Sequence, residues 1–196
     1  IAVKAALLRA TGDYSAAEEV LKGLFEADPL NMLAHSESYF LHRDQGLTAI
    51  AESARNEFKK MLYRGAQDYI ETAIDYAECG LYGHSEEILK MGIDVSKGNV
   101  NPLLYYYLGQ YALIQGQESK ARQYFDQAAG CSPDYVFPNR PETIEALKSA
   151  IDLNANDWKP RYYLGTYLAA KDQWQDALRI YYEAEQLGAD YSVLYR

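Results

Sequence analysis

Three histidines are the side chains of this 196-residue chain that could bind a metal or exchange protons near neutral pH. His35 and His42 lie on one predicted helix, and His84 lies near the start of a later one. A metal or catalytic site would need acidic or thiol partners at a matching spacing, as in His-Glu-x-x-His, and the sequence has no such pattern. It also has no phosphate-binding Gly-rich motif and no Gly-x-Ser-x-Gly motif. The sequence therefore predicts structural histidines, no enzyme activity, no cofactor and no metal.

The composition narrows the class of partner. The formal net charge of −9 argues against nucleic acid as a ligand, because phosphate binding needs concentrated Lys and Arg. No stretch is apolar for long enough to span a bilayer, so we expect no membrane partner. Tyrosine is abundant, with 19 Tyr against five Phe, which suits half-buried seams between helices and binding grooves. No targeting segment is recognised, so the compartment stays open, with the cytoplasm slightly favoured.

Glycines recur at a nearly constant interval and indicate a repeat. Gly12, Gly46, Gly80 and Gly116 follow one another at this interval, and each lies between two helical patterns. The interval is the period of a two-helix repeat. A glycine at the end of a helix commonly adopts a positive φ that closes the turn. The pattern predicts an all-α, right-handed solenoid of two-helix repeats.

The best-formed repeats show which residues pack the two helices of a hairpin together. Small residues let the helices approach, and large ones fill the space beside them. The predicted packing residues are Gly109, Ala121, Phe125 and Ala128 in one repeat and Gly165, Ala177, Tyr181 and Ala184 at the same places in a later one.

The distance along the chain from Gly109 to Gly165 is longer than one repeat period, which implies an insertion between these two repeats. Pro138 and Pro141 exclude a helix from residues 134–141, and a new helical pattern starts directly after Pro141. We predict a half repeat whose first helix is replaced by an extended segment carrying Tyr135, Val136 and Phe137. The ranges are 1–30 (repeat 1, partial), 31–64 (repeat 2, degenerate), 65–100 (repeat 3), 101–133 (repeat 4), 134–157 (extended segment plus extra helix), 158–189 (repeat 5) and 190–196 (start of a further helix). Both ends are cut within a repeat, so we expect a fragment of a longer protein.

These motifs resemble the tetratricopeptide repeat (TPR) across the whole chain. More narrowly, the segments AIDYAECGLYGHSEEIL (73–89), DYVFPNRPETIEAL (134–147) and WKPRYYLGTYL (158–168) resemble large bacterial proteins of unknown function. In that family a TPR array follows an epimerase-like, β-rich domain. The resemblance implies a link to carbohydrate metabolism in the parent protein.

In TPR arrays the first helix of each hairpin lines a concave groove, which predicts where a ligand contacts this chain. The candidate groove residues are Ile70, Ile74, Tyr106, Gln110, Leu113, Tyr162 and Thr166. Either a ligand occupies this groove or the extended segment around Phe137 fills it. Trp158 and Trp174, at helix starts, are expected to pack in the core. The predicted function is a non-catalytic scaffold that binds a protein or peptide, or the rest of its own chain, and self-association through uncapped ends is possible. The alternative is an accessory module that positions or shields a carbohydrate-active domain elsewhere in the same protein.

Overall fold

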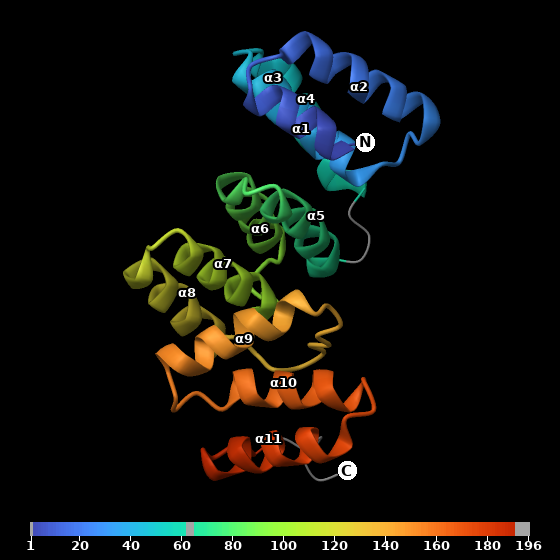
Figure 1. Cartoon of the computed structure of the whole chain (residues 1–196). Coiled ribbons are helices and arrows are strands. Elements are labelled where there is room, and N and C mark those ends of the chain that lie inside the picture. Colours follow the sequence, from blue (N-terminus) through green and yellow to red (C-terminus); the bar gives the residue numbers. More distant parts are fainter. Residues whose placement is uncertain (1, 62–64, 191–196) are drawn as a thin grey trace. The chain divides into compact units, whose positions relative to one another are not determined.

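The helices of this chain follow one another in antiparallel pairs joined by tight turns. The computed structural model describes residues 2–61 and 65–190, which form α-helices and contain no strand. The helices are α1 (Ala2–Ala10), α2 (Tyr14–Ala27), α3 (Met32–Asp44), α4 (Thr48–Met61), α5 (Ala66–Glu78), α6 (Tyr82–Val95), α7 (Pro102–Ile114), α8 (Glu118–Gly130), α9 (Glu142–Leu153), α10 (Lys159–Ala169) and α11 (Trp174–Gln186) (Figure 1). The predicted all-α class of helical hairpin repeats is confirmed. None of these helices is long and apolar enough to cross a bilayer.

The turn glycines act as the sequence predicts. All four have positive φ, between 72° and 85°. At Gly116 the turn is closed by two backbone hydrogen bonds, from the Gly116 N–H to Leu113 O (2.9 Å) and from the Gln117 N–H to Ala112 O (2.8 Å). This pair of bonds satisfies carbonyls at the end of α7 and reverses the chain into α8. A single residue in the left-handed region therefore ends the first helix of each of these four hairpins.

The helices group into two compact units, residues 1–88 and 89–196, and the boundary falls within α6. In the first unit α1 packs on α2, α3 packs on α4, and α3 also contacts α1 and α2. Small and medium apolar side chains form the core between α1, α2 and α3, because they allow close approach of the helices. The buried members are Ala5, Ala17, Leu21, Ala34 and Leu41.

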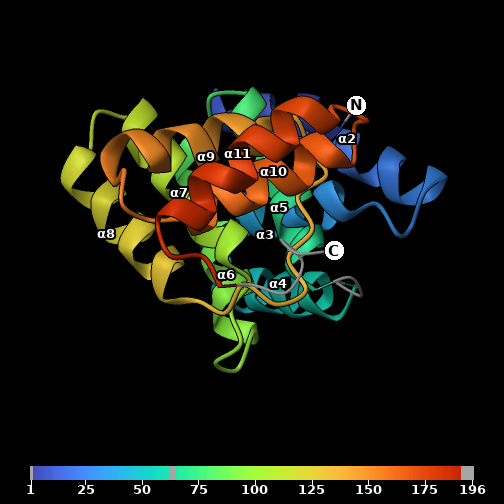
Figure 2. The same ribbon diagram turned by 90° about the horizontal axis from the view of Figure 1, so that it is seen from below.

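The second unit contains the two best-formed hairpins, α7–α8 and α10–α11, with α9 between them. Helix α9 contacts both α7 and α10, and Figures 1 and 2 both place it beside α10. It begins directly after Pro141, as the sequence predicts. The Tyr107 hydroxyl and the Thr143 hydroxyl, 2.7 Å apart, share a buried hydrogen bond that joins α7 to α9.

The segment before α9 has buried and exposed side chains in alternation. Val136 and Pro138 are buried, whereas Tyr135 and Phe137 are 88% and 69% exposed. Tyr135 lies in a turn with a φ of 59°, and residues 136–140 have no regular secondary structure. The Phe137 side chain itself is not enclosed, and both alternatives for the concave groove, a ligand or the segment around Phe137, stay predictions. The further helix predicted at residues 190–196 lies outside the described residues, apart from the non-helical Asp190.

Candidate functional site

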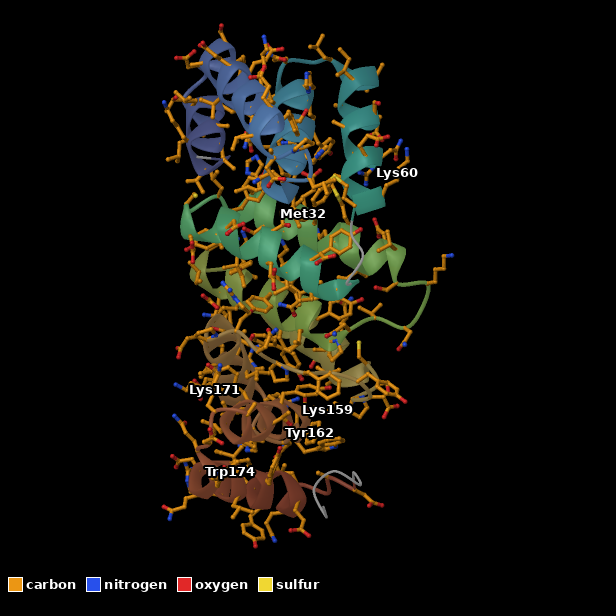
Figure 3. The ribbon with its side chains drawn as sticks, turned by 90° about the vertical axis from the view of Figure 1, so that its right-hand side faces the viewer. Met32, Lys60, Lys159, Tyr162, Lys171 and Trp174 are labelled. Carbon is orange, nitrogen blue, oxygen red and sulfur yellow. The ribbon has the colours of Figure 1, made fainter. Side chains whose placement is uncertain are left out.

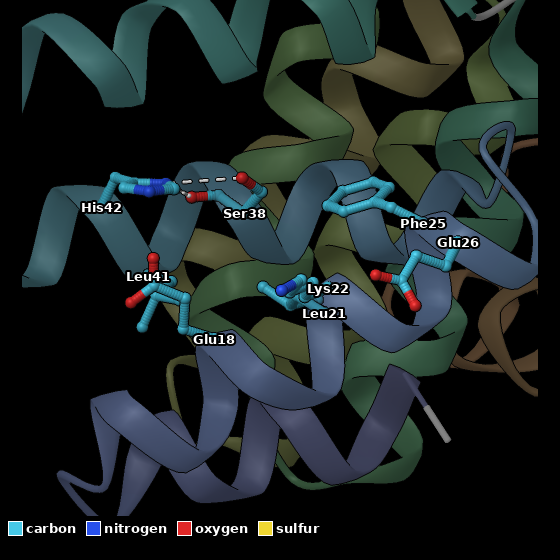
Figure 4. A pocket seen from close by; sticks show the side chains of 8 residues that line it. All are labelled: Glu18, Leu21, Lys22, Phe25, Glu26, Ser38, Leu41 and His42. Atoms are coloured by element: carbon cyan, nitrogen blue, oxygen red, sulfur yellow. Dashed lines mark hydrogen bonds between the residues drawn. The ribbon is translucent and has the colours of Figure 1, made fainter.

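A hollow between α2 and α3 in the first unit is a candidate for a binding site. Its volume is about 440 Å³, within the range of ligand pockets. We call it the α2–α3 groove, and Figure 4 shows the side chains that line it, which are Glu18, Leu21, Lys22, Phe25, Glu26, Ser38, Leu41 and His42.

Helical spacing brings these side chains to one place. The α2 residues recur at intervals of three and four, which puts them on one face of that helix. The start of α2 is fixed by Asp13, whose carboxylate accepts the Ala16 N–H at 3.1 Å. The start of α3 is fixed by Asn31, which accepts the Ala34 N–H at 2.9 Å. Both side chains satisfy backbone donors that the helix itself cannot pair, so each helix begins at a defined residue.

The floor of the α2–α3 groove is apolar and its rim is charged. Leu21 and Leu41 are buried, and Phe25 is half-buried with its ring 4.8 Å from that of His35. Glu18, Lys22 and Glu26 are exposed along the rim. Such a site can cover an apolar side chain of a ligand while the rim contacts polar or basic neighbours of that side chain.

His42 is held by its own helix. Its Nδ1 lies 2.6 Å from the Ser38 carbonyl oxygen, as Figure 4 shows. Because a carbonyl only accepts, Nδ1 carries the proton, and Nε2 is the acceptor of the neutral ring. His35 is held similarly, with Nε2 2.8 Å from Pro29 O. The two rings lie on α3 with separate backbone partners, which is consistent with structural roles.

Sequence reasoning missed a buried polar cluster in the same unit. The Arg9 side chain, 2% exposed, donates from Nε to Glu37 Oε1 at 2.5 Å and from Nη1 to Asp44 Oδ2 at 2.6 Å. The Tyr76 hydroxyl donates to Glu37 Oε2 at 3.0 Å. Arg9 and Glu37 lie on the core-facing sides of their helices, which the pattern of each helix alone does not identify. We call Arg9, Glu37, Asp44, Tyr76 and His84 the Arg9 cluster.

Burial sets the direction of the pKa shift at Glu37, Tyr76 and His84 of the Arg9 cluster. At Asp44, in contrast, burial is outweighed by the hydrogen bonds and charges of Arg9 and Arg43, which lower its pKa. Burial raises the pKa of Glu37, against the opposing hydrogen bond and charge of Arg9, and it raises the pKa of Tyr76 well above its usual value. His84 packs against Phe40 and Tyr76, with ring centroids 4.5 and 5.7 Å away. Burial, together with the charges of Arg9 and Arg43, lowers the pKa of His84 to about 4. Because Arg9, Glu37 and Tyr76 pair with one another in the interior and the His84 ring stacks on that of Tyr76, we interpret the cluster as a link between α1, α3, α5 and α6.

The predicted concave-groove residues fall into two sets. Four of them are buried, which are Ile70, Ile74, Tyr106 and Tyr162. The Tyr106 ring packs against Phe125 and Tyr163, at centroid distances of 6.2 and 5.9 Å, and is closed to a ligand in this structure. The partly exposed set is Gln110, Leu113 and Thr166. These three keep some accessible surface on α7 and α10 and remain candidates.

The predicted packing residues bring α7 and α8, and likewise α10 and α11, into contact. A Cβ atom added to Gly109 would lie 2.2 Å from Phe125 Cε1, and one added to Gly165 would lie 2.5 Å from Tyr181 Cε1. Both distances are far below van der Waals contact, so each glycine makes room for the aromatic ring of the following helix. The four small residues Ala121, Ala128, Ala177 and Ala184 are buried on α8 and α11.

The expectation for Trp174 is wrong. Its side chain is 59% exposed, at the first residue of α11, where the turn from α10 leaves it uncovered (Figure 3). Trp158 is half-buried, and its ring lies 6.1 Å from that of Tyr162.

The fold defines a helical-repeat protein. A family model described as Tetratricopeptide repeat matches residues 52–136, which include α5 to α8. The match supports a protein-interaction module. No curated protein sequence matches this chain.

The solved structures that are similar to this chain include PilF, MamA and YrrB. PilF of Pseudomonas aeruginosa is 14% identical, with 98% of this chain and 78% of that chain covered and a TM-score of 0.37. MamA is 18% identical, with 93% of each chain covered and a TM-score of 0.34. YrrB, described as a TPR protein with an unusual peptide-binding site, is 11% identical, with 97% and 86% covered and a TM-score of 0.31. These similarities assign no functional role to any residue of this chain.

Proposed function

We propose that this chain is a non-catalytic TPR array whose α2–α3 groove receives an apolar side chain of a partner peptide. The observation that carries the proposal is the pairing of a buried leucine floor, Leu21 and Leu41, with an exposed charged rim. An apolar side chain that enters the groove leaves water, at about 25 cal/mol per Å² of apolar surface covered. The rim holds two carboxylates and one ammonium group, so we expect basic residues beside the inserted side chain.

A non-catalytic role fits the state of the ionisable groups. Arg9, Glu37 and Tyr76 of the Arg9 cluster are buried and paired with one another, so a substrate would have to break an internal ion pair to reach them. We propose that the remaining repeats, in the ranges predicted from the sequence, extend the interaction surface along the chain.

Selection from a random peptide library tests the groove directly. The selected peptides are then measured by fluorescence anisotropy against the wild type and against Ser38→Phe, which places a ring in the hollow. We expect the dissociation constant to rise at least tenfold for Ser38→Phe. Glu18→Lys with Glu26→Lys should weaken basic peptides, whereas a control pair on α9, Glu145→Lys with Asp152→Lys, should not. Equal binding to wild type and Ser38→Phe would contradict the proposal.

The alternative function stays a prediction. Positioning or shielding of a carbohydrate-active domain rests on the three segments that resemble large bacterial proteins with an epimerase-like domain. It would be favoured if the parent protein bound sugars while this chain alone bound no selected peptide.

A further inference from the structure

One wall of the α2–α3 groove carries a ring nitrogen that can accept a hydrogen bond. His42 lines the groove from α3, and its Nδ1 lies 2.6 Å from Ser38 O and 3.3 Å from Ser38 Oγ, as Figure 4 shows. The carbonyl oxygen can only accept, so Nδ1 is the protonated nitrogen and Nε2 keeps its lone pair. Helix α3 itself therefore sets the tautomer of the ring before any ligand binds.

The second histidine of α3 is held in a different way. His35 uses Nε2, which lies 2.8 Å from Pro29 O, and it does not line the groove. The two hydrogen bonds that His42 makes to the described residues both use Nδ1. Nε2 is also the ring nitrogen farther from Cγ, and so from the backbone of α3. The accepting nitrogen of His42 is therefore available to a ligand in the groove.

The surroundings of His42 restrict which donor can reach Nε2. Leu41 and His42 are consecutive and both line the groove, and the buried Leu21 lines it from α2. A donor group must therefore be joined to an apolar body that covers the leucines. A purely apolar side chain in this place would take Nε2 out of water without a hydrogen bond in exchange, and this loss weakens binding.

The indole of tryptophan meets both requirements. It is apolar except for one N–H group, which only donates. The groove volume of about 440 Å³ exceeds that of an indole, and the half-buried Phe25 offers a ring against which another aromatic ring can pack. Lysine and arginine also donate, but each would have to bring a charge close to the apolar floor, which costs hydration.

We propose that the partner residue in the α2–α3 groove is a tryptophan, whose indole N–H donates to His42 Nε2 while its rings cover Leu21 and Leu41. This inference rests on the proposed function, because it names the apolar side chain that the groove receives. His42 then selects tryptophan over phenylalanine, and Ser38 is a positioning residue whose carbonyl oxygen fixes the imidazole tautomer.

Peptides that differ in one group test the hydrogen bond. The probes are capped pentapeptides of sequence Lys-Gly-Xaa-Gly-Lys, in which Xaa is tryptophan, phenylalanine or benzothienylalanine, an analogue of tryptophan with sulfur in place of the N–H. Dissociation constants come from NMR titration at pH 8, where an unperturbed imidazole is neutral. We expect the tryptophan peptide to bind about fivefold more tightly than the other two. The Nε2 resonance of His42 should move toward that of a protonated nitrogen with the tryptophan peptide and not with the benzothienylalanine peptide.

A matched pair of histidine substitutions assigns the effect. His42→Phe keeps a ring in the wall but removes the acceptor, so the tryptophan and benzothienylalanine peptides should bind this variant equally. His35→Phe, on the same helix but outside the groove lining, should keep the preference of about fivefold. If His42→Phe fails to fold, the Nε2 resonance of the wild-type protein decides.

Several results would overturn the proposal. Equal binding of the tryptophan and benzothienylalanine peptides by the wild type would remove the hydrogen bond, and a preference that persists in His42→Phe would place the acceptor on another side chain. Tighter binding of a tyrosine peptide than of the tryptophan peptide would make a hydroxyl the donor.

Ser38→Phe separates this inference from the proposed function. If Ser38→Phe weakens every peptide while the wild type binds the tryptophan and benzothienylalanine peptides equally, the groove binds apolar side chains and only the assignment of tryptophan fails. If the wild type and Ser38→Phe bind every peptide equally, or if no peptide binds at millimolar concentration, both proposals fail.

Discussion

Gly109 on α7 and Gly165 on α10 occupy the same place in their hairpins, and each accommodates an aromatic ring from the next helix. The ring is Phe125 in the α7–α8 hairpin and Tyr181 in the α10–α11 hairpin. Phe125 is 3% exposed, whereas Tyr181 is half-buried and its hydroxyl donates to Thr166 Oγ1 at 3.1 Å. The two hairpins therefore share one arrangement of small and large residues, and they differ in how tightly the aromatic ring is enclosed.

The outer faces of the same two hairpins differ more strongly. Helix α8 carries the Glu118–Arg122 pair, and helix α11 carries Trp174 and Leu178 at the equivalent places. The inner positions are constrained because each touches another helix, and on the outer face of α8 Arg122 also donates from Nη1 to Leu153 O at 3.0 Å, at the end of α9. The comparison teaches that function in such repeats is to be sought where the outer pattern departs from its neighbours.

The largest effect is expected from filling the space beside the rings. Gly109→Ala places a methyl group against a buried ring, and overpacking of this kind costs about 1–3 kcal/mol. Gly165→Ala should cost less than about 1 kcal/mol, because Tyr181 can move toward solvent and alanine favours the helix. Urea unfolding followed by circular dichroism measures both values.

A second substitution tests the cause. Gly109→Ala should cost less stability in a Phe125→Leu background than in the wild type, since the clash with residue 125 is then smaller. Equal costs for the two glycine substitutions would show that enclosure of the ring is not what separates the hairpins.

Lys159 provides the next largest difference between the hairpins. Its ammonium group, at the start of α10, donates to the carbonyl oxygens of Ala129 and of Cys131 (2.5 Å) at the end of α8. The equivalent residue of the α7–α8 hairpin is Leu103, which is buried. Lys159→Met should cost about 1–2 kcal/mol, because hydrogen bonds from a charged group to helix-end carbonyls are lost.

The control for Lys159 is Lys171→Met. The ammonium group of Lys171 lies over the Tyr167 ring at 5.5 Å, and the residue is exposed. We expect a change within about 0.5 kcal/mol in the same unfolding assay. A loss at Lys171 as large as that at Lys159 would mean that the contacts to α8 do not explain the effect.

The turn that follows α10 shows what a search for glycines overlooks. Asp172 stands where the preceding hairpin has Gly116, and it has a φ of 59°. Its N–H bonds to Ala169 O at 3.1 Å while the Gln173 N–H bonds to Leu168 O at 3.0 Å. The backbone is the same as at Gly116. Aspartate tolerates this conformation better than most residues, so the turn persists without its glycine.

This turn also marks the limit of sequence reasoning for the chain. The period, the helix pairs and the close contacts at Gly109 and Gly165 followed from residue size and spacing. The exposure of Trp174 and the burial of Arg9 did not, because the pattern of a single helix does not say which of its faces a neighbour covers. The α2–α3 groove was missed for the same reason, since its lining comes from two helices that each look ordinary alone.

Substitutions of the turn residues Gly116 and Asp172 should change stability in opposite directions, and by less than the substitutions above. Gly116→Ala should destabilise by about 1 kcal/mol, because alanine is strained at positive φ. Asp172→Gly should stabilise by less than about 1 kcal/mol, since the strain falls while the unfolded chain gains freedom. Thermal unfolding by calorimetry measures both. If Asp172→Gly were as destabilising as Gly116→Ala, the aspartate carboxylate would have a role beyond its backbone angle.

The smallest stability effect is expected from giving α11 the outer face of α8. Trp174→Glu with Leu178→Arg recreates the pair that Glu118 and Arg122 form, and such a pair at i, i+4 stabilises a helix by about 0.2–0.5 kcal/mol. The variant should unfold at nearly the wild-type urea concentration. A destabilisation above about 1 kcal/mol, larger than outer-face substitutions usually cause, would mean that Trp174 and Leu178 support the fold of α11 itself. The difference between the two outer faces would then reflect packing.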